Sequence, residues 1–314
     1  MILVTTDGFT ALLVGRILIG LTNAIIWTAG AALAAGRPGA VARAIGAGGA
    51  GRLAGPLLAS ALAGEAGARA VFAAAAVLTL ATTIVFHHAD RPASPPAALQ
   101  STQRTVAGPL RPALKDSSVR VAALGLLLLG FTEGAANLLA PAQLHADGLT
   151  SASIGALGTL AAGMAFATTT LARRLVERHD ATLLAASAAF GLGVAWSIPA
   201  VSASVVAVAS FLIAFAVART LLNPASYLLA RDGAAAAGAG TAITLGATNL
   251  LLGAGGLTGP LLASLGLAHP QLAQATIALL CLASATAIAR SARRHTTGPG
   301  GRATPQQDQA PARR

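Results

Sequence analysis

The sequence predicts an all-α integral membrane protein, a helical bundle that crosses the bilayer about nine times. Three observations support this fold class: 55% of the 314 residues are hydrophobic, only 10% are charged, and the mean hydropathy is +0.71. Because a soluble domain carries about a quarter charged residues, this chain cannot cover a surface that faces water. Ala and Gly are abundant and aromatic residues make up only 4%, a composition that lets helix backbones approach closely in lipid.

The nine predicted spans are the stretches that reach the roughly 20 mostly apolar residues that a membrane-crossing helix needs. They are residues 9–35, 41–64, 69–87, 121–144, 149–172, 181–199, 202–229, 236–265 and 269–290. Two boundaries need an argument, because residues 181–218 and 233–289 carry no charge and each stretch is too long for one span. A Ser-rich turn that contains Pro199 divides the first stretch, and His269-Pro270 divides the second.

Four segments follow from these spans. Residues 1–87 form a partial N-terminal bundle of three spans, and residues 121–291 form a C-terminal bundle of six. Residues 88–120 between them hold five prolines and several basic residues, which cannot sit in lipid, so we expect a water-exposed cytoplasmic linker. Residues 292–314 are rich in Gly, Pro, Gln and Arg, and we expect them to form a disordered cytoplasmic tail.

An internal repeat relates the two bundles. The hexapeptide Gly-Pro-Leu-Leu-Ala-Ser at residues 55–60 recurs at residues 259–264, and each copy follows a Gly-Ala-Gly-Gly run in an apolar span. Arg16 and Arg219 are separated by almost the same distance along the chain. Such a repeat within membrane-type sequence is typical of a duplicated helical bundle. The alternative is chance, since Gly, Ala and Leu are abundant.

Charge and cysteine usage exclude several function classes. The net charge is +11, but the arginines form no basic stripe interleaved with aromatic residues, so we expect no nucleic-acid partner. Cys281 is the only cysteine, which excludes disulfide frameworks and Cys-based metal sites. No His pair has metal-ligand spacing with a carboxylate, and no Ser/His/Asp order, phosphate loop or dinucleotide fingerprint is present. The sequence therefore predicts no metal, no cofactor and no enzyme activity.

Basic residues set the predicted orientation, because the cytoplasmic loops of membrane proteins carry an excess of Lys and Arg. With residues 88–119 in the cytoplasm and the spans alternating from there, 17 of the 21 basic residues fall on the cytoplasmic side. Arg69 alone falls outside, while Arg16, Arg52 and Arg219 remain within spans. We therefore expect a multi-pass protein of a bacterial cytoplasmic (inner) membrane, with its C-terminus in the cytoplasm and its N-terminus, as given, outside.

Glu133 is the carboxylate that lies deepest in a predicted span, about twelve residues into 121–144. A charged group at that depth is costly and is a functional candidate by default. Because removal from water favours the protonated carboxyl, Glu133 suits a group that binds and releases protons. Asn137 lies four residues further on, on the same helix face. The alternative is a protonated Glu133 that hydrogen bonds to a neighbouring helix.

Two polar stripes are expected to face a water-filled cavity, because polar residues in membrane helices usually do so. The first consists of Arg16, Gly20, Asn23 and Trp27. The second consists of Arg219, Asn223 and Ser226 or Tyr227. Helical spacing places the members of each stripe on one face. The alternative for the arginines is that their side chains reach the membrane interface.

Two N-terminal stretches resemble motifs of a known protein family. The segment from Arg16 to Gly20 resembles a fourth-span pattern in which an Arg stands four residues before a Gly. Gly51, Gly55 and Pro56 stand as in the fifth-span antiporter pattern, although Ala59-Ser60 replaces its two final glycines.

Two C-terminal stretches extend the likeness. Residues 173–180 resemble the family's short cytoplasmic loop, with Glu177 in place of its Asp and with Arg178 matching its Arg. Residues 253–264 resemble the eleventh span, the internal partner of the fifth, and its packing positions would be Gly255, Gly259 and Pro260. On these motifs the chain resembles the major facilitator superfamily of secondary transporters over residues 9–290.

The resemblance implies twelve spans in two six-span halves, and this chain would begin at the fourth. Residues 1–87 would then correspond to spans four to six, and residues 121–291 to spans seven to twelve. The family's central cavity is lined by spans one, four, seven and ten, so Arg16, Glu133 and Arg219 would fall on three of those four. The Gly- and Pro-containing motifs would serve tight helix packing and gating.

The function that this resemblance implies is secondary active transport of small molecules by alternating access, specifically as a proton-coupled efflux permease or antiporter. Glu133 would exchange the proton, the two in-span arginines would hold the field or an anionic group, and Asn23, Asn137 and Asn223 would bond substrate. The expected partners are the lipid bilayer, a small-molecule substrate and protons, and we expect a monomer. The alternative is a truncated or degenerate relative without transport activity.

Overall fold

The computed structural model describes residues 55, 58, 70–71, 73–81 and 110–296 of the chain, and every regular element among them is helical. The elements are α5 (Leu110–Lys115), α6 (Ser117–Ala146), α7 (Ser151–Arg178), α8 (Ala181–Val201), α9 (Val205–Ala236), α10 (Thr241–Leu265) and α11 (Pro270–Thr296). In this part of the chain, the six helices α6 to α11 are long and apolar enough to cross a membrane. The predicted all-α membrane fold is confirmed.

Several predictions lie outside the described residues. They include the spans at 9–35 and 41–64 apart from two isolated residues, the ends of the span 69–87, most of the linker and most of the tail. Within the predicted third span, residues 73–81 are helical.

Three boundaries differ from the prediction. Residues 173–178 were expected in a loop but form the last turns of α7, so Glu177 and Arg178 are helical. The break between α9 and α10 lies at residues 237–240, further along the chain than predicted. The expected linker 88–120 ends in α5 and the first turn of α6. Helices α6, α7 and α9 extend past the apolar stretches that hydropathy detects, because the water-facing ends of a helix can carry polar residues.

Capping residues define where the helices begin and end. Asp116 Oδ1 accepts hydrogen bonds from the backbone N–H groups of Ser118 and Val119 at 2.8 and 3.2 Å, which caps α6. Asp180 caps α8 in the same way, and such caps are typically worth about 1 kcal/mol. After α6 and α9 the chain reverses through Gly148 and Gly238, whose positive φ angles of 82° and 62° suit Gly.

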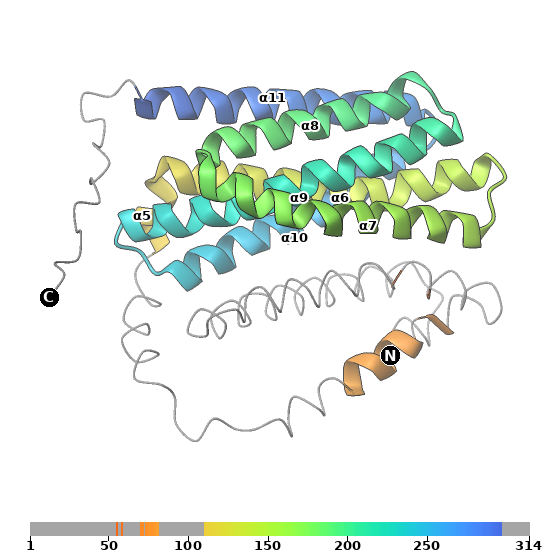
Figure 1. Ribbon diagram of the computed structural model, residues 1–314, viewed down its shortest axis with the longest axis horizontal. Helices are drawn as coiled ribbons and strands as arrows, with labels where there is room; N and C mark the ends of the chain where they lie inside the picture. Colours follow the sequence, from red (N-terminus) through yellow and green to blue (C-terminus); the bar gives the residue numbers. More distant parts are fainter. Residues whose placement is uncertain (1–54, 56–57, 59–69, 72, 82–109, 297–314) are drawn as a thin grey trace, which may run out of the picture.

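The helices of the described part lie roughly side by side in an elongated bundle (Figure 1), with α6 and α9 at its centre. Helix α6 packs against α10 and α9, α8 packs against α9 and α11, and α7 lies mainly against α9. An aromatic cluster joins α8 to α9, where the Trp196 ring centroid lies 4.6 Å from that of Phe211, which lies 5.6 Å from that of Phe215. The rest of the core is mostly Leu and Ala, so small side chains hold the helices close together.

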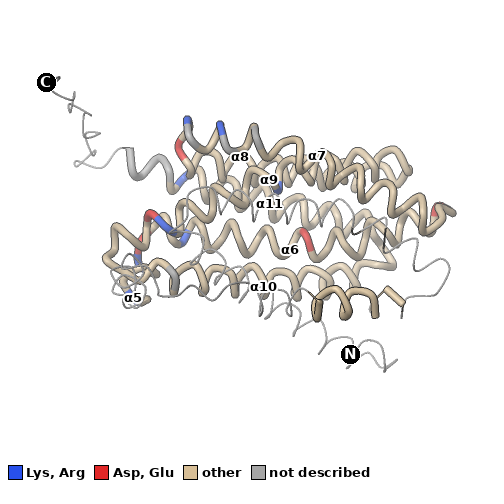
Figure 2. Tube along the Cα trace, turned by 60° about the horizontal axis from the view of Figure 1, so that its bottom comes forward, with Lys and Arg blue, Asp and Glu red and all other residues tan. Residues whose placement is uncertain are grey.

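Basic residues are distributed unequally between the two ends of the bundle. Figure 2 shows the Lys and Arg residues of the described part gathered mainly at the end where α5 lies. They are Arg111, Lys115, Arg120, Arg174, Arg178, Arg231 and Arg290, on the described helices that begin or end there. The turns at the opposite end, residues 147–150, 202–204 and 266–269, contain no Lys or Arg. Between the two ends the outward side chains are largely apolar, as lipid requires.

Candidate functional site

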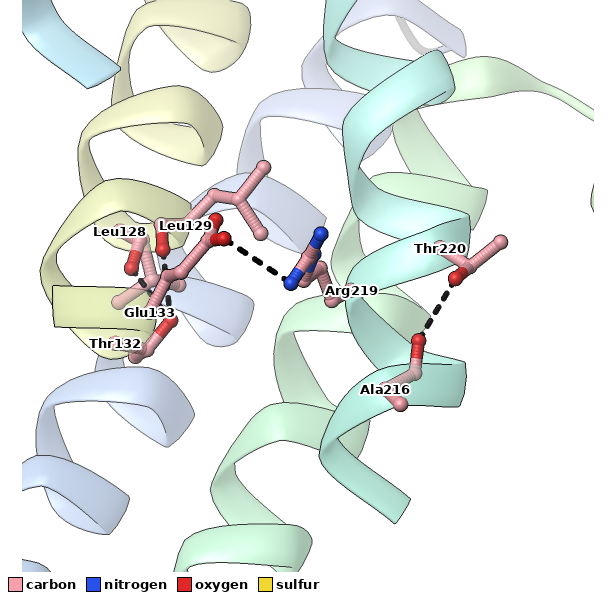
Figure 3. Close-up of polar contacts among 7 residues, drawn as sticks. All are labelled: Leu128, Leu129, Thr132, Glu133, Ala216, Arg219 and Thr220. Carbon is pink, nitrogen blue, oxygen red and sulfur yellow. Dashed lines mark hydrogen bonds and ion pairs between the residues drawn. The ribbon is translucent and has the colours of Figure 1, made fainter. Parts of the chain in front are cut away.

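An ion pair joins two helices in the middle of the bundle. Arg219 on α9 places its Nη1 3.1 Å from Oε1 of Glu133 on α6 (Figure 3). The Glu133 side chain is 35% exposed and the Arg219 side chain 17%, so the pair is partly desolvated and still open on one side. The other ion pair found in the described residues links the neighbours Arg231 and Asp232 on one helix.

Both charges lie near the midpoint of a membrane-length helix. Glu133 follows the start of α6 by about 24 Å of helix axis and Arg219 follows the start of α9 by about 21 Å, at 1.5 Å per residue. Helices of 30 and 32 residues extend beyond both sides of a hydrocarbon core about 30 Å thick. Neither charge therefore sits at a helix end, and pairing lowers the cost of holding both at that depth.

Neighbouring hydroxyl groups are satisfied within their own helices. Thr132 Oγ1 donates to the carbonyl oxygen of Leu128 at 2.8 Å, and Thr220 Oγ1 donates to that of Ala216 at 2.8 Å (Figure 3). In the described structure, both threonine hydroxyl groups thus donate to backbone carbonyl oxygens of their own helix. Among the described residues, the charged partner of the Glu133 carboxylate is the Arg219 guanidinium.

Glycines on either side of Glu133 bring α10 against α6. A Cβ atom at Gly130 or Gly134 would overlap the backbone of α10, and a Cβ at Gly255 or Gly259 would overlap the backbone of α6. Two small-xxx-small pairs therefore face each other, which is a common close-packing arrangement of membrane helices. Helices α6 and α10 form a tightly packed unit that holds Glu133 in position.

The packing pair on α6 was not predicted, because the packing residues expected in the C-terminal bundle were Gly255, Gly259 and Pro260. Pro260 lies beside Gly134, since a Cβ at Gly134 would approach its Cδ to 2.7 Å. The four-residue spacing of Gly130 and Gly134 in an apolar helix is the signal that could have identified them.

Polar side chains continue from the ion pair along α9. Asn223 lies one turn beyond Arg219 and its Oδ1 is buried without a hydrogen-bond partner in the described part of the chain. Further along, Tyr227 donates its hydroxyl proton to Oδ1 of Asn249 on α10. Asn249 was not predicted, although an amide in an uncharged span is itself a signal. Asn137 is exposed in the described structure, one turn from Glu133 on α6.

A second buried polar contact lies at the end opposite the basic residues. Gln274 Nε2 on α11 donates to Gln143 Oε1 on α6 at 2.7 Å, and both residues are buried. Gln143 Nε2 and Gln274 Oε1 have no partner among the described residues. The one hydrogen bond therefore satisfies the oxygen of Gln143 and the nitrogen of Gln274. The sequence analysis did not consider either residue.

Replacing Gln274 by Leu is expected to destabilise the protein by about 1–2 kcal/mol, because the Gln143 amide then loses its partner in an apolar interface. The double variant Gln143→Leu/Gln274→Leu should recover most of this loss, since no amide is left unsatisfied. Unfolding of the purified protein in detergent, followed by circular dichroism, measures both. Equal loss in the single and double variants would contradict a coupled pair.

The remaining predicted site residues are not assembled by the described structure. Arg16, Asn23, Gly51 and Pro56 lie outside the described residues. Gly55 is helical, and a Cβ there would meet nothing within 4 Å. The described part contains no group of three or more His, Cys, Asp or Glu side chains able to hold a metal ion.

Six membrane-length helices around an ion pair at mid-depth define a polytopic membrane protein with a polar site inside its bundle. The family model of the Major Facilitator Superfamily matches residues 1–260. The chain belongs to this superfamily and is a membrane transporter of the major facilitator kind, which confirms the predicted family. Neither the comparison with curated proteins nor the comparison with solved structures gives a match.

Proposed function

We propose that this protein is a proton-coupled exporter of small molecules, in which Glu133 exchanges a proton for substrate during alternating access. The observation that supports this proposal is the Glu133–Arg219 ion pair, which joins α6 to α9 at mid-depth. A carboxylate whose charged partner in the described part of the chain is one arginine can exist in two states, paired when ionised and released when protonated. In the first state an ion pair joins α6 to α9, and in the second state it is absent.

Exchange follows from competition for one carboxylate. A proton that binds Glu133 removes its negative charge, and Arg219 then loses its ionic partner. A cationic or donor-bearing substrate that contacts Glu133 displaces the guanidinium in the same way, so proton and substrate exclude each other. The Oδ1 of Asn223 lies one turn from Arg219 and has no hydrogen-bond partner among the described residues, so it offers a second acceptor for such a substrate.

The proposed orientation places the basic end of the bundle in the cytoplasm of a bacterial cell. The described residues that support it are the seven exposed or partly exposed Lys and Arg residues at the end where α5 lies, against none in the turns at the other end. This distribution matches the excess of basic residues found on the cytoplasmic side of membrane proteins. The C-terminal end of α11 would then face the cytoplasm.

Everted membrane vesicles that contain the full chain provide the test. After a proton gradient is formed, addition of a cationic probe such as ethidium is expected to release protons, seen as dequenching of a pH-sensitive dye. Vesicles without the protein give the background. If proteoliposomes of the purified chain move neither ethidium nor a panel of organic amines under an imposed gradient, the result would favour a family member without transport activity.

A further inference from the structure

A groove runs along the outward face of α8 and α11. It has a volume of about 350 Å³ and is lined by Leu183, Ser187 and Phe190 from α8 and by Ala285, Thr286 and Ala289 from α11. Leu183 and Phe190 are 56% and 57% exposed and form its walls, while the small side chains of α11 leave room between them. From Leu183 to Phe190, seven residues further along, the helix axis extends about 10 Å.

One end of the groove lies toward the basic end of the bundle. Helices α8 and α11 pack side by side, and α11 ends where α8 begins. Arg290 is exposed and lies one turn beyond Thr286, so it extends the groove-lining face of α11. Arg178, also exposed, ends α7 two residues before Asp180, the residue that caps α8.

An acidic residue, Asp180, lies next to the start of α8. Its Oδ1 accepts hydrogen bonds from the backbone N–H groups of Thr182 and Leu183 at 2.8 and 3.0 Å. One oxygen of its carboxylate is therefore occupied by hydrogen bonds to the start of α8. The exposed side chains at the start of α8, the end of α7 and Arg290 therefore include two arginines, Arg178 and Arg290, beside this one aspartate.

We propose that this groove binds an anionic phospholipid, with part of one acyl chain between α8 and α11 and the phosphate held by Arg290. The apolar lining matches an acyl chain, and the groove covers about a third of a hydrocarbon core roughly 30 Å thick. An Arg guanidinium suits a phosphate because it donates two parallel hydrogen bonds to its oxygens. A purely apolar occupant, such as a helix of another protein, would leave the cation without a role.

The test compares lipids on the purified full chain in detergent by native mass spectrometry. Phosphatidylglycerol is expected to bind more tightly than phosphatidylcholine of the same chain length. Arg290→Gln should reduce that preference about fivefold, because one basic residue near an anionic surface contributes about that factor to the binding constant. Arg120→Gln, which removes an exposed charge from the same end of the bundle but on α6, serves as the matched control and should leave the preference unchanged.

Two further variants separate the headgroup from the chain. Asp180→Asn keeps a good helix cap and removes the negative charge, so the preference for phosphatidylglycerol should increase. Ala285→Phe fills the groove and should weaken both lipids. Equal binding of the two lipids by the unmodified protein, or an unchanged preference in Arg290→Gln, would overturn the proposal, as would a second protein chain occupying the groove. None of these measurements depends on transport.

Discussion

Glu133→Gln is expected to reduce proton-driven export to the level of membranes that lack the protein. The glutamine cannot release a proton, so it holds the site in the state that protonated Glu133 would adopt, and exchange stops. Because glutamine is neutral and has nearly the same shape as glutamate, the protein should fold and insert normally. The measurement is dye dequenching in everted vesicles with ethidium, together with the amount of protein recovered in the membrane.

Asp147→Asn is the control for this prediction. It also neutralises one carboxylate, but Asp147 lies exposed in the turn after α6, and export should be unaffected. Substrate equilibration without a gradient should also be lost in Glu133→Gln, because in this proposal the substrate binds the ionised carboxylate that the variant lacks. Gradient-driven export at the unmodified rate in Glu133→Gln would remove this residue from the coupling mechanism.

Gly255→Ala is expected to destabilise the packing of α10 against α6. The added Cβ would overlap the backbone of α6 near Leu127 and Phe131, and a helix backbone cannot yield as a flexible side chain can. Separating the two helices costs about 1–3 kcal/mol by overpacking and also displaces Glu133. The midpoint of thermal unfolding in detergent should fall, and gradient-driven export should decrease with it.

Gly253→Ala provides a closely matched comparison. It lies on the same helix two residues away, and a Cβ there would meet nothing within 4 Å in the described structure. Because Ala favours a helix over Gly by up to about 1 kcal/mol, this variant should be neutral or slightly stabilised. If the two variants behaved alike, the close crossing of α6 and α10 would not exist in the protein.

Much of the fold followed from hydropathy and from a few turn residues. His269-Pro270 predicted the break before α11, which begins at Pro270, and the Ser-rich turn predicted the break between α8 and α9. Prediction failed at helix ends such as Arg178, because charged residues outside the lipid can continue a helix that hydropathy no longer detects. The polar contacts of Gln143 and Gln274 were missed, since 131 residues separate them.

The sequence alone determined that this protein is solvated by lipid and that Glu133 and Arg219 lie deep within spans, because both conclusions depend only on the order of polar and apolar residues. Only the tertiary structure decided that these two charges form a pair and that the glycines beside Glu133 meet those of α10. The physical reason is that lipid does not drive helices together as water does. The faces that meet are therefore chosen by close packing and by a few polar contacts between residues far apart in the chain.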